Sequence, residues 1–180
     1  YSANNTFAFD NIAINRTFSL VAPGTMNNTK IQYTVNANAI VTLNTNFTNG
    51  GAPFNVNGTL YCQDKVLDGT GVFNVNAGAT LGVGHADGIT LLADGALGNI
   101  QVTGTRSYLA TANYIYTGSL AQITGSGLIG ANNLTIDNSS VAGVTQANAA
   151  NTATTVSVGG TLTLTDGTYD IGGIAGQLNT

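Results

Sequence analysis

The sequence predicts an all-β protein, with a right-handed parallel β-helix as the leading architecture and an antiparallel β-sandwich as the alternative. Apolar residues alternate with small or polar ones through much of the 180 residues, which is the period of a β-strand. One alternating phrase also recurs along the chain at a spacing of one or two coils. Imperfect repetition of this kind is typical of solenoids and rare in sandwiches.

Residues 71–106 show the alternation most clearly. The odd-numbered positions from Phe73 to Val83 are apolar, whereas the positions between them are Asn, Gly or Thr. The pattern breaks at residues 85–88 and at Asp94-Gly95, and it resumes with Ile89 and Leu91 and again with Ile100 and Val102. This order predicts a strand, a corner, a second strand, a corner and a third strand. We expect four side chains to face the core: Phe73, Val75, Leu81 and Val83.

The first 53 residues are less regular. Short alternating stretches predict strands near residues 7–9, 12–14, 18–20, 31–35 and 41–43. A turn is expected at Pro23-Gly24, and residues 49–51 (Asn-Gly-Gly) end the section.

From residue 54 onward one phrase appears three times. The copies are FNVNGTLYC at 54–62, FNVNAGATLGV at 73–83 and VSVGGTLTLTDGTYDIGG at 156–173. Leu60 and Leu81 lie 21 positions apart, which suggests that one coil separates them. The low-complexity segment QANAANTATT at 146–155 is expected to form a loop.

No linker divides the chain, so we predict one β-solenoid unit over residues 1–180. Within it, residues 1–53 form less regular coils and residues 54–173 form repeat-like coils. The chain starts with Tyr1 and lacks a charged-then-apolar leader, and we expect it to be a segment of a much longer protein.

The composition argues against binding to nucleic acid and against a membrane span. Only 7% of the residues are charged, the net charge is −4, and the chain contains four Lys and Arg residues against eight Asp and no Glu. No apolar run approaches the roughly 20 residues that a membrane-spanning helix needs. Cys62 is the single cysteine, and it shares the parity of Leu60, so we expect a buried, unreactive thiol.

The sequence offers little catalytic chemistry. His85 is the one histidine, and Asp87 lies on the same tight corner, where it is badly placed to orient the imidazole from behind. Arg16 and Arg106 are too distant in sequence to be taken as a pair. Four of the eight Asp residues precede Gly, which a turn explains without function: Asp68, Asp87, Asp94 and Asp166.

Stacked Asp corners would suit calcium, yet the dense Gly-Gly-x-Gly-x-Asp nonapeptide of calcium-binding β-rolls is absent. We therefore predict no catalytic, cofactor-binding or metal-binding residues.

Several segments, taken in order, resemble one known repeat: GTLYC, GTGVFNVNAGATLGVGHADGI, GALGNIQVTGTRSY, ANYIYTGSLAQITGSGL, ANNLTIDNSS and VGGTLTLTDGTYDIG. This run, from Phe54 to Gly173, looks like the repeat of very large surface proteins of Bacteroidota, which are type IX secretion cargo and include the SprB-like gliding-motility adhesins. Residues 1–53 match only in texture. Two departures are the insert at 146–155 and the lack, in these 180 residues, of the C-terminal sorting domain that such cargo carries.

The resemblance implies a β-helical surface filament that is exported across the outer membrane and that supports adhesion or gliding. Its expected partners are surface glycans or abiotic surfaces, neighbouring repeats or end-to-end copies, and the secretion and gliding machinery. The resemblance supplies no catalytic motif. We therefore expect a non-enzymatic, extracellular module at the cell surface.

Two alternatives stay open. A carbohydrate-active β-helix enzyme would need acidic residues or an Arg gathered on one face. A binding face made of ordered threonines is suggested by Thr161, Thr163 and Thr165, which alternate with leucines in the manner of ice-binding solenoids.

Overall fold

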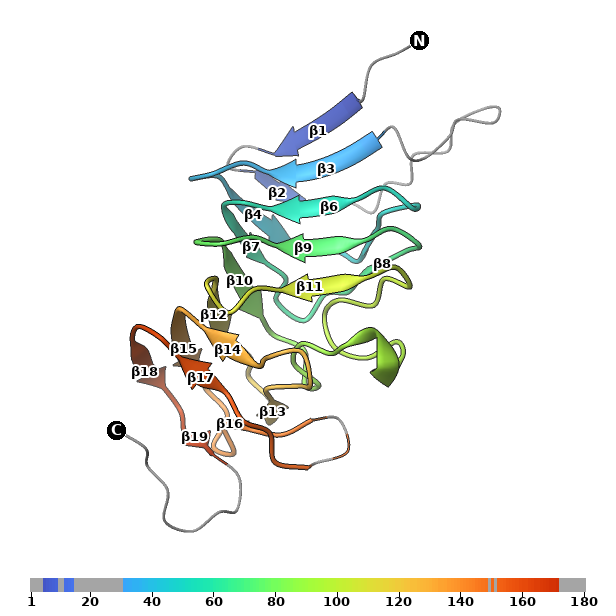
Figure 1. The fold of residues 1–180 in the computed structure, drawn as a ribbon. Coiled ribbons are helices and arrows are strands. Elements are labelled where there is room, and N and C mark those ends of the chain that lie inside the picture. Colours follow the sequence, from blue (N-terminus) through green and yellow to red (C-terminus); the bar gives the residue numbers. More distant parts are fainter. Residues whose placement is uncertain (1–4, 10–11, 15–30, 149, 151, 172–180) are drawn as a thin grey trace.

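The structure is a computed structural model that describes residues 5–9, 12–14, 31–148, 150 and 152–171. It is all-β, and its strands form parallel sheets (Figure 1). The one helical element in these ranges is a 3-10 turn, η2 (Leu92–Asp94).

Two large sheets contain most of the strands. Within each sheet the strands follow one another from the N-terminal end of the molecule to the C-terminal end (Figure 1). The five-stranded sheet contains, in spatial order, β1 (Asn5–Phe9), β3 (Ile31–Val35), β6 (Phe54–Val56), β9 (Phe73–Val75) and β11 (Arg106–Tyr108). The seven-stranded sheet contains, from one edge to the other, β2 (Ile12–Ile14), β4 (Ile40–Leu43), β7 (Thr59–Tyr61), β10 (Thr80–Val83), β12 (Asn113–Tyr116), β15 (Asn133–Asp137) and β18 (Leu162–Asp166).

Three smaller sheets complete the fold. The three-stranded sheet contains β13 (Gln122–Ile123), β16 (Val144–Thr145) and β19 (Tyr169–Asp170). The two-stranded sheets pair β5 (Phe47–Thr48) with β8 (Leu67–Asp68), and β14 (Gly130–Ala131) with β17 (Ser157–Val158).

All the pairings between these strands are parallel. Within the described ranges, antiparallel pairing is limited to one isolated bridge, between Ala147 and Ala153. The antiparallel sandwich that the sequence left open therefore does not describe this chain.

The repeated phrases pair with each other in register. Leu60 on β7 pairs with Leu81 on β10, and Phe54 on β6 pairs with Phe73 on β9. We call the stretch from one strand of the seven-stranded sheet to the next a pass. The 21 positions between Leu60 and Leu81 are thus one pass, as the repeat predicts.

The core contains the side chains that the alternation places inward. Phe73, Val75, Leu81 and Val83 are completely buried, which confirms their predicted orientation. The Phe54 and Phe73 rings stack with centroids 5.8 Å apart, so like residues also pack on like residues inside the protein. Ala77 shares their parity but is exposed, because it lies in the corner between β9 and β10 where the extended backbone is interrupted.

The strands expected at residues 89–91 and 100–102 are largely absent. Ile100 makes a single bridge to Leu67, and residues 89–91 form no strand. Leu81 pairs with Tyr114, which lies 33 positions later, so this pass is longer than the one before it, and the extra residues form an irregular loop. Ile89, Ile100 and Val102 are nevertheless buried, because the loop folds back onto the core.

Some of the other predicted strands and loops are confirmed, and the rest lie outside the described residues. The strands predicted near residues 7–9, 12–14, 31–35 and 41–43 correspond to β1, β2, β3 and β4. The described residues between β16 and β17 form no strand apart from the isolated bridge, which agrees with a loop around residues 146–155. The strand expected at 18–20, the turn at Pro23-Gly24, and Arg16 and Lys30 lie outside the residues that the structure describes.

In the part of the chain that the structure describes, no helix has the length and apolar character needed to cross a bilayer.

Candidate functional site

His85 and Asp87 lie together in the corner that follows β10. The Asp87 backbone N–H donates to His85 Nδ1 at 3.2 Å, and Asp87 Oδ2 lies 3.6 Å from the same nitrogen. Both contacts are within one turn, so they fix the local shape of the corner. In the described ranges, no three His, Cys, Asp or Glu side chains gather as they would around a metal ion.

The Asp-Gly pairs lie where the chain turns, as the sequence predicts: Asp68 and Asp166 end strands β8 and β18, Asp94 ends η2, and Asp87 lies in a turn. The four glycines concerned all have positive φ, from 64° at Gly88 to 114° at Gly69. Glycine takes this left-handed conformation without the steric cost that a Cβ imposes, so the corner geometry accounts for the pairs.

Of the two basic residues that lie in the described ranges, Lys65 and Arg106, it is Arg106 whose placement the sequence did not predict. It points into the core at 6% exposure, and its guanidinium donates to backbone oxygens of Val102 (3.0 Å), Thr90 (3.3 Å), Leu91 (3.3 Å) and Gly95 (2.8 Å). Burial lowers the pKa of this guanidinium. Because carbonyl oxygens occupy its donors, Arg106 fastens the irregular loop to the core and leaves little capacity for a ligand.

Cys62 is completely buried, as expected. Burial raises the pKa of its thiol to about 12, because the thiolate would be stranded in an apolar interior. A neutral thiol is a poor nucleophile, so Cys62 is a core residue.

Threonines do not form one continuous rank on the seven-stranded sheet. One outward row runs through Thr42, Tyr61, Gly82, Ile115, Thr135 and Thr163. Thr135 and Thr163 are adjacent in this row, whereas the four preceding positions mix several residue types. A flat array of one residue type, which an ice-binding face requires, is therefore limited to short stretches.

Asparagines on the outer surface bond to one another between passes. Asn74 Nδ2 donates to Asn55 Oδ1 at 2.9 Å, and Asn76 Nδ2 donates to Asn57 Oδ1 at 2.7 Å. Asn133 Nδ2 donates to Asn113 Oδ1 at 2.9 Å. These contacts stabilise the stack and occupy amide groups that a ligand would otherwise find free.

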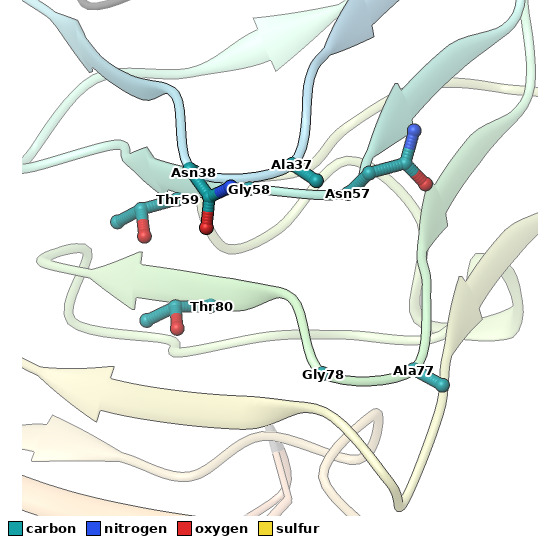
Figure 2. Close-up of a pocket in the computed structure, with 8 residues that line it drawn as sticks. All are labelled: Ala37, Asn38, Asn57, Gly58, Thr59, Ala77, Gly78 and Thr80. Atoms are coloured by element: carbon teal, nitrogen blue, oxygen red, sulfur yellow. The ribbon is translucent and has the colours of Figure 1, made fainter.

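A surface depression lies at the corner between the five-stranded and the seven-stranded sheets (Figure 2). It has a volume of about 330 Å³, and we call it the corner groove. Its lining residues come from three successive passes: Ala37, Asn38, Asn57, Gly58, Thr59, Ala77, Gly78 and Thr80. None of them is ionisable.

The corner groove exists because one corner is shorter than its neighbours. Four residues connect β3 to β4 and four connect β9 to β10, but only Asn57 and Gly58 connect β6 to β7. A Cβ at Gly58 would collide with the carbonyl oxygen of Asn36, so the short corner runs directly against the corner before it. The longer corners at Ala37-Asn38 and Ala77-Gly78 project on either side and form the walls.

Three uncommitted polar side chains line the groove. Thr59 and Thr80 are paired in register and project in the same direction, and Asn38 descends from the preceding corner (Figure 2). Within the described part of the chain, none of these three side chains makes a hydrogen bond. Their amide and hydroxyl groups are therefore available to solvent or to a ligand.

Sequence reasoning missed this groove, although a signal for it was present. The phrases VNANAI at 35–40, VNGT at 56–59 and VNAGAT at 75–80 are corner segments of different length. Aligning the three on their Val-Asn starts shows that the middle one lacks two residues.

Neither a known family model nor a curated protein nor a solved structure gives a significant match to this chain. What the chain does must therefore be inferred from its own surface chemistry.

Proposed function

We propose that this chain is a non-enzymatic structural and adhesive segment of a large bacterial cell-surface adhesin or filament, supporting attachment and gliding. The observation that carries the proposal is the in-register parallel stacking of neutral outer rows, of which the asparagine pairs 55/74 and 57/76 are the clearest. Such stacking makes a stiff body with many copies of a weakly hydrogen-bonding surface. Weak contacts repeated along one body give strong attachment by avidity.

The finer architecture that we propose is a right-handed parallel β-helix. Its support is the recurring order in which the chain enters the sheets: β3, β4 and β5 occupy three different sheets, and β6, β7 and β8 enter the same three in the same order. Strands that pair in parallel need a crossover, and a crossover that wraps the chain around a common core is the solenoid solution.

The proposed setting follows from the resemblance to Bacteroidota surface repeats. The segment is placed outside the cell, at the cell surface, after export by a type IX pathway. Its proposed partners are glycans or abiotic surfaces, adjacent repeats, and the secretion and gliding machinery of the outer membrane.

A comparison of single and multiple copies tests the function. The purified chain is assayed for binding to polysaccharide-coated surfaces, first as a free unit and then displayed in many copies on beads. We expect the free unit to bind poorly and the beads to bind well, with no release of reducing sugar in either case. Deleting the full-length gene should impair adhesion or surface movement. Polysaccharide turnover that one Asp→Asn substitution abolishes would replace the proposal with a carbohydrate-active enzyme.

A further inference from the structure

We propose that the corner groove, together with the ring of Tyr61, is a binding site for one ring of a neutral saccharide. The inference rests on the proposed adhesive function and names the chemical class and the place of one of its contacts. It is carried by the shape of the groove, by polar side chains that make no hydrogen bond in the described part of the chain, and by the half-exposed ring of Tyr61 on the same strand as Thr59.

The shape of the corner groove suits a small ligand. Its walls belong to passes on either side of the short corner, about two strand spacings or roughly 9.6 Å apart. Its volume of about 330 Å³ lies at the lower end of the range for small-molecule sites, which is about 300–1,000 Å³. One sugar ring is a better match to this space than an extended peptide or a longer chain.

The polar groups match a polyhydroxylated ligand. The Asn38 amide supplies two donors and an acceptor, and the Thr59 and Thr80 hydroxyls can each donate and accept. A sugar presents neighbouring hydroxyls that also do both. Because no ionisable residue lines the groove, an anionic or cationic ligand would lose hydration there without meeting an opposite charge.

Asn38 has the left-handed backbone conformation that its corner requires, but the fold does not require the residue there to be asparagine. Its φ is 68°, and Gly78, which takes the equivalent corner position two passes later, has φ 75°. Glycine would be the cheaper residue at such a position. The Asn38 side chain makes no hydrogen bond within the described part of the chain. Other outward asparagines do: Asn74 donates to Asn55, and Asn76 donates to Asn57.

Tyr61 extends the groove with an aromatic surface. It is the next outward position after Thr59 on β7, about 7 Å further along the strand. Its ring lies across Gly82 on β10, where a Cβ would collide with Tyr61 Cδ1, so the glycine allows the ring to lie close to the sheet. A half-exposed ring with a polar tip offers an apolar surface to the C–H groups of a sugar while its hydroxyl remains free to hydrogen-bond.

Titration by two-dimensional NMR tests the site. The ¹⁵N-labelled chain is titrated with glucose, galactose, mannose and N-acetylglucosamine, and with glucuronate as an anionic control. We expect at least one neutral sugar to give saturable shifts at Asn38, Thr59, Tyr61 and Thr80, with a Kd on the order of 1 mM. Glucuronate should bind no more tightly than its neutral parent.

Three variants locate the binding. Asn38→Gly keeps the backbone conformation and should weaken binding about ten-fold. Inserting Ala-Gly between Asn57 and Gly58 lengthens the short corner to that of its neighbours, and it should abolish the shifts. Thr135→Val alters the same face of the seven-stranded sheet far along the stack, and it should bind as the parent does. Thermal unfolding of each variant verifies the fold.

Three outcomes would overturn the proposal: no saturable shift with any neutral sugar, undiminished binding by the insertion variant, or tighter, salt-sensitive binding of glucuronate. The bead assay separates this result from the wider function. If beads carrying the insertion variant still attach to polysaccharide, the adhesive function stands and the groove is not its contact.

Discussion

Single residues on one strand differ sharply in what they tolerate. Val75 is completely buried, whereas its neighbour Asn74 is half-buried and donates to Asn55 on the outer surface. Val75→Asp should lower the free energy of unfolding by several kcal/mol because it buries an unpaired carboxylate. Asn74→Asp should cost less than about 1 kcal/mol, since its carboxylate stays hydrated. Chemical denaturation of both variants measures the difference, and equal losses would mean that the register is wrong.

Cys62 should be inert in the folded protein. Its thiol is completely buried, so a thiol reagent should label it only on unfolding. Labelling with DTNB in the presence and absence of denaturant measures this. Rapid labelling without denaturant would contradict the inward placement.

The same thiol should make stability depend on pH in the alkaline range. Its pKa rises from about 9 to about 12 on folding, so the folded state keeps a proton that the unfolded state loses. This contribution is complete below pH 9 and is lost as the pH rises toward 12. Between pH 8 and pH 10 the parent should lose about 1 kcal/mol relative to Cys62→Ala. Chemical denaturation of both proteins at the two pH values measures this. The same change in the free energy of unfolding for the parent and for Cys62→Ala would contradict it.

For single residues, the sequence predicts which side chains face the core wherever the chain is an alternating strand. Phe73, Val75, Leu81 and Val83 were placed correctly, because residues on a strand point to opposite sides in turn. Ala77 is an exception because it lies in a corner. The burial of Arg106 could not be predicted, because the oxygen acceptors that stabilise its charge lie mainly on loop residues 90–95, and alternation does not show that this loop folds back onto Arg106.

Among the elements, the irregular loop before β11 depends on Arg106. Arg106→Met would leave the carbonyl groups of Thr90, Leu91 and Gly95 without their shared donor. We expect amide protons of residues 89–99 to exchange faster, and the free energy of unfolding to fall by about 2–3 kcal/mol. Hydrogen exchange read by mass spectrometry reports both.

Lys65→Met is the matched control, because Lys65 pairs with its exposed neighbour Asp64 at 2.7 Å and should matter by less than about 0.5 kcal/mol. Unchanged exchange of the loop in Arg106→Met would show that the loop holds its shape by other contacts.

The sequence predicted the strands correctly in a short pass and incorrectly in a long one. The pass from Leu60 to Leu81 repeats its phrase with little change, and pattern alone places its strands. In the following pass Gly88 and Gly95 have positive φ at the two predicted corners, but the residues between them form bends and the 3-10 turn η2 in place of the expected strand. The corner groove likewise depends on the lengths of successive corners. The difference between them shows which corner is recessed only once it is known that β6 pairs with β9.

For the whole molecule, we expect association to depend on β18, which ends the seven-stranded sheet among the described strands. Leu162 and Leu164 pair in register with the fully buried Leu134 and Ile136, yet they are 46% and 58% exposed. Apolar side chains on an unpaired strand edge favour pairing with another chain. We expect the isolated chain to associate end to end with rising concentration.

Sedimentation velocity measures this association, which Leu164→Lys should suppress. Leu120→Lys is the control, because Leu120 is 70% exposed but lies outside the strands. A strictly monomeric parent at high concentration would refute the expectation.

The in-register match of residues 54–62 with residues 73–83 also bears on how such a chain changes over generations. The stretch from Phe54 to Val72 is 19 residues that begin and end at equivalent points of successive passes, since Phe54 pairs with Phe73. An in-frame duplication of those 19 codons would therefore add a layer whose Phe, Val and Asn side chains meet copies of themselves above and below. The stack would grow by one strand spacing, about 4.8 Å, without a new core having to be selected. Length is thus a trait that recombination can alter in discrete steps, while the ends and the irregular loop stay as they are.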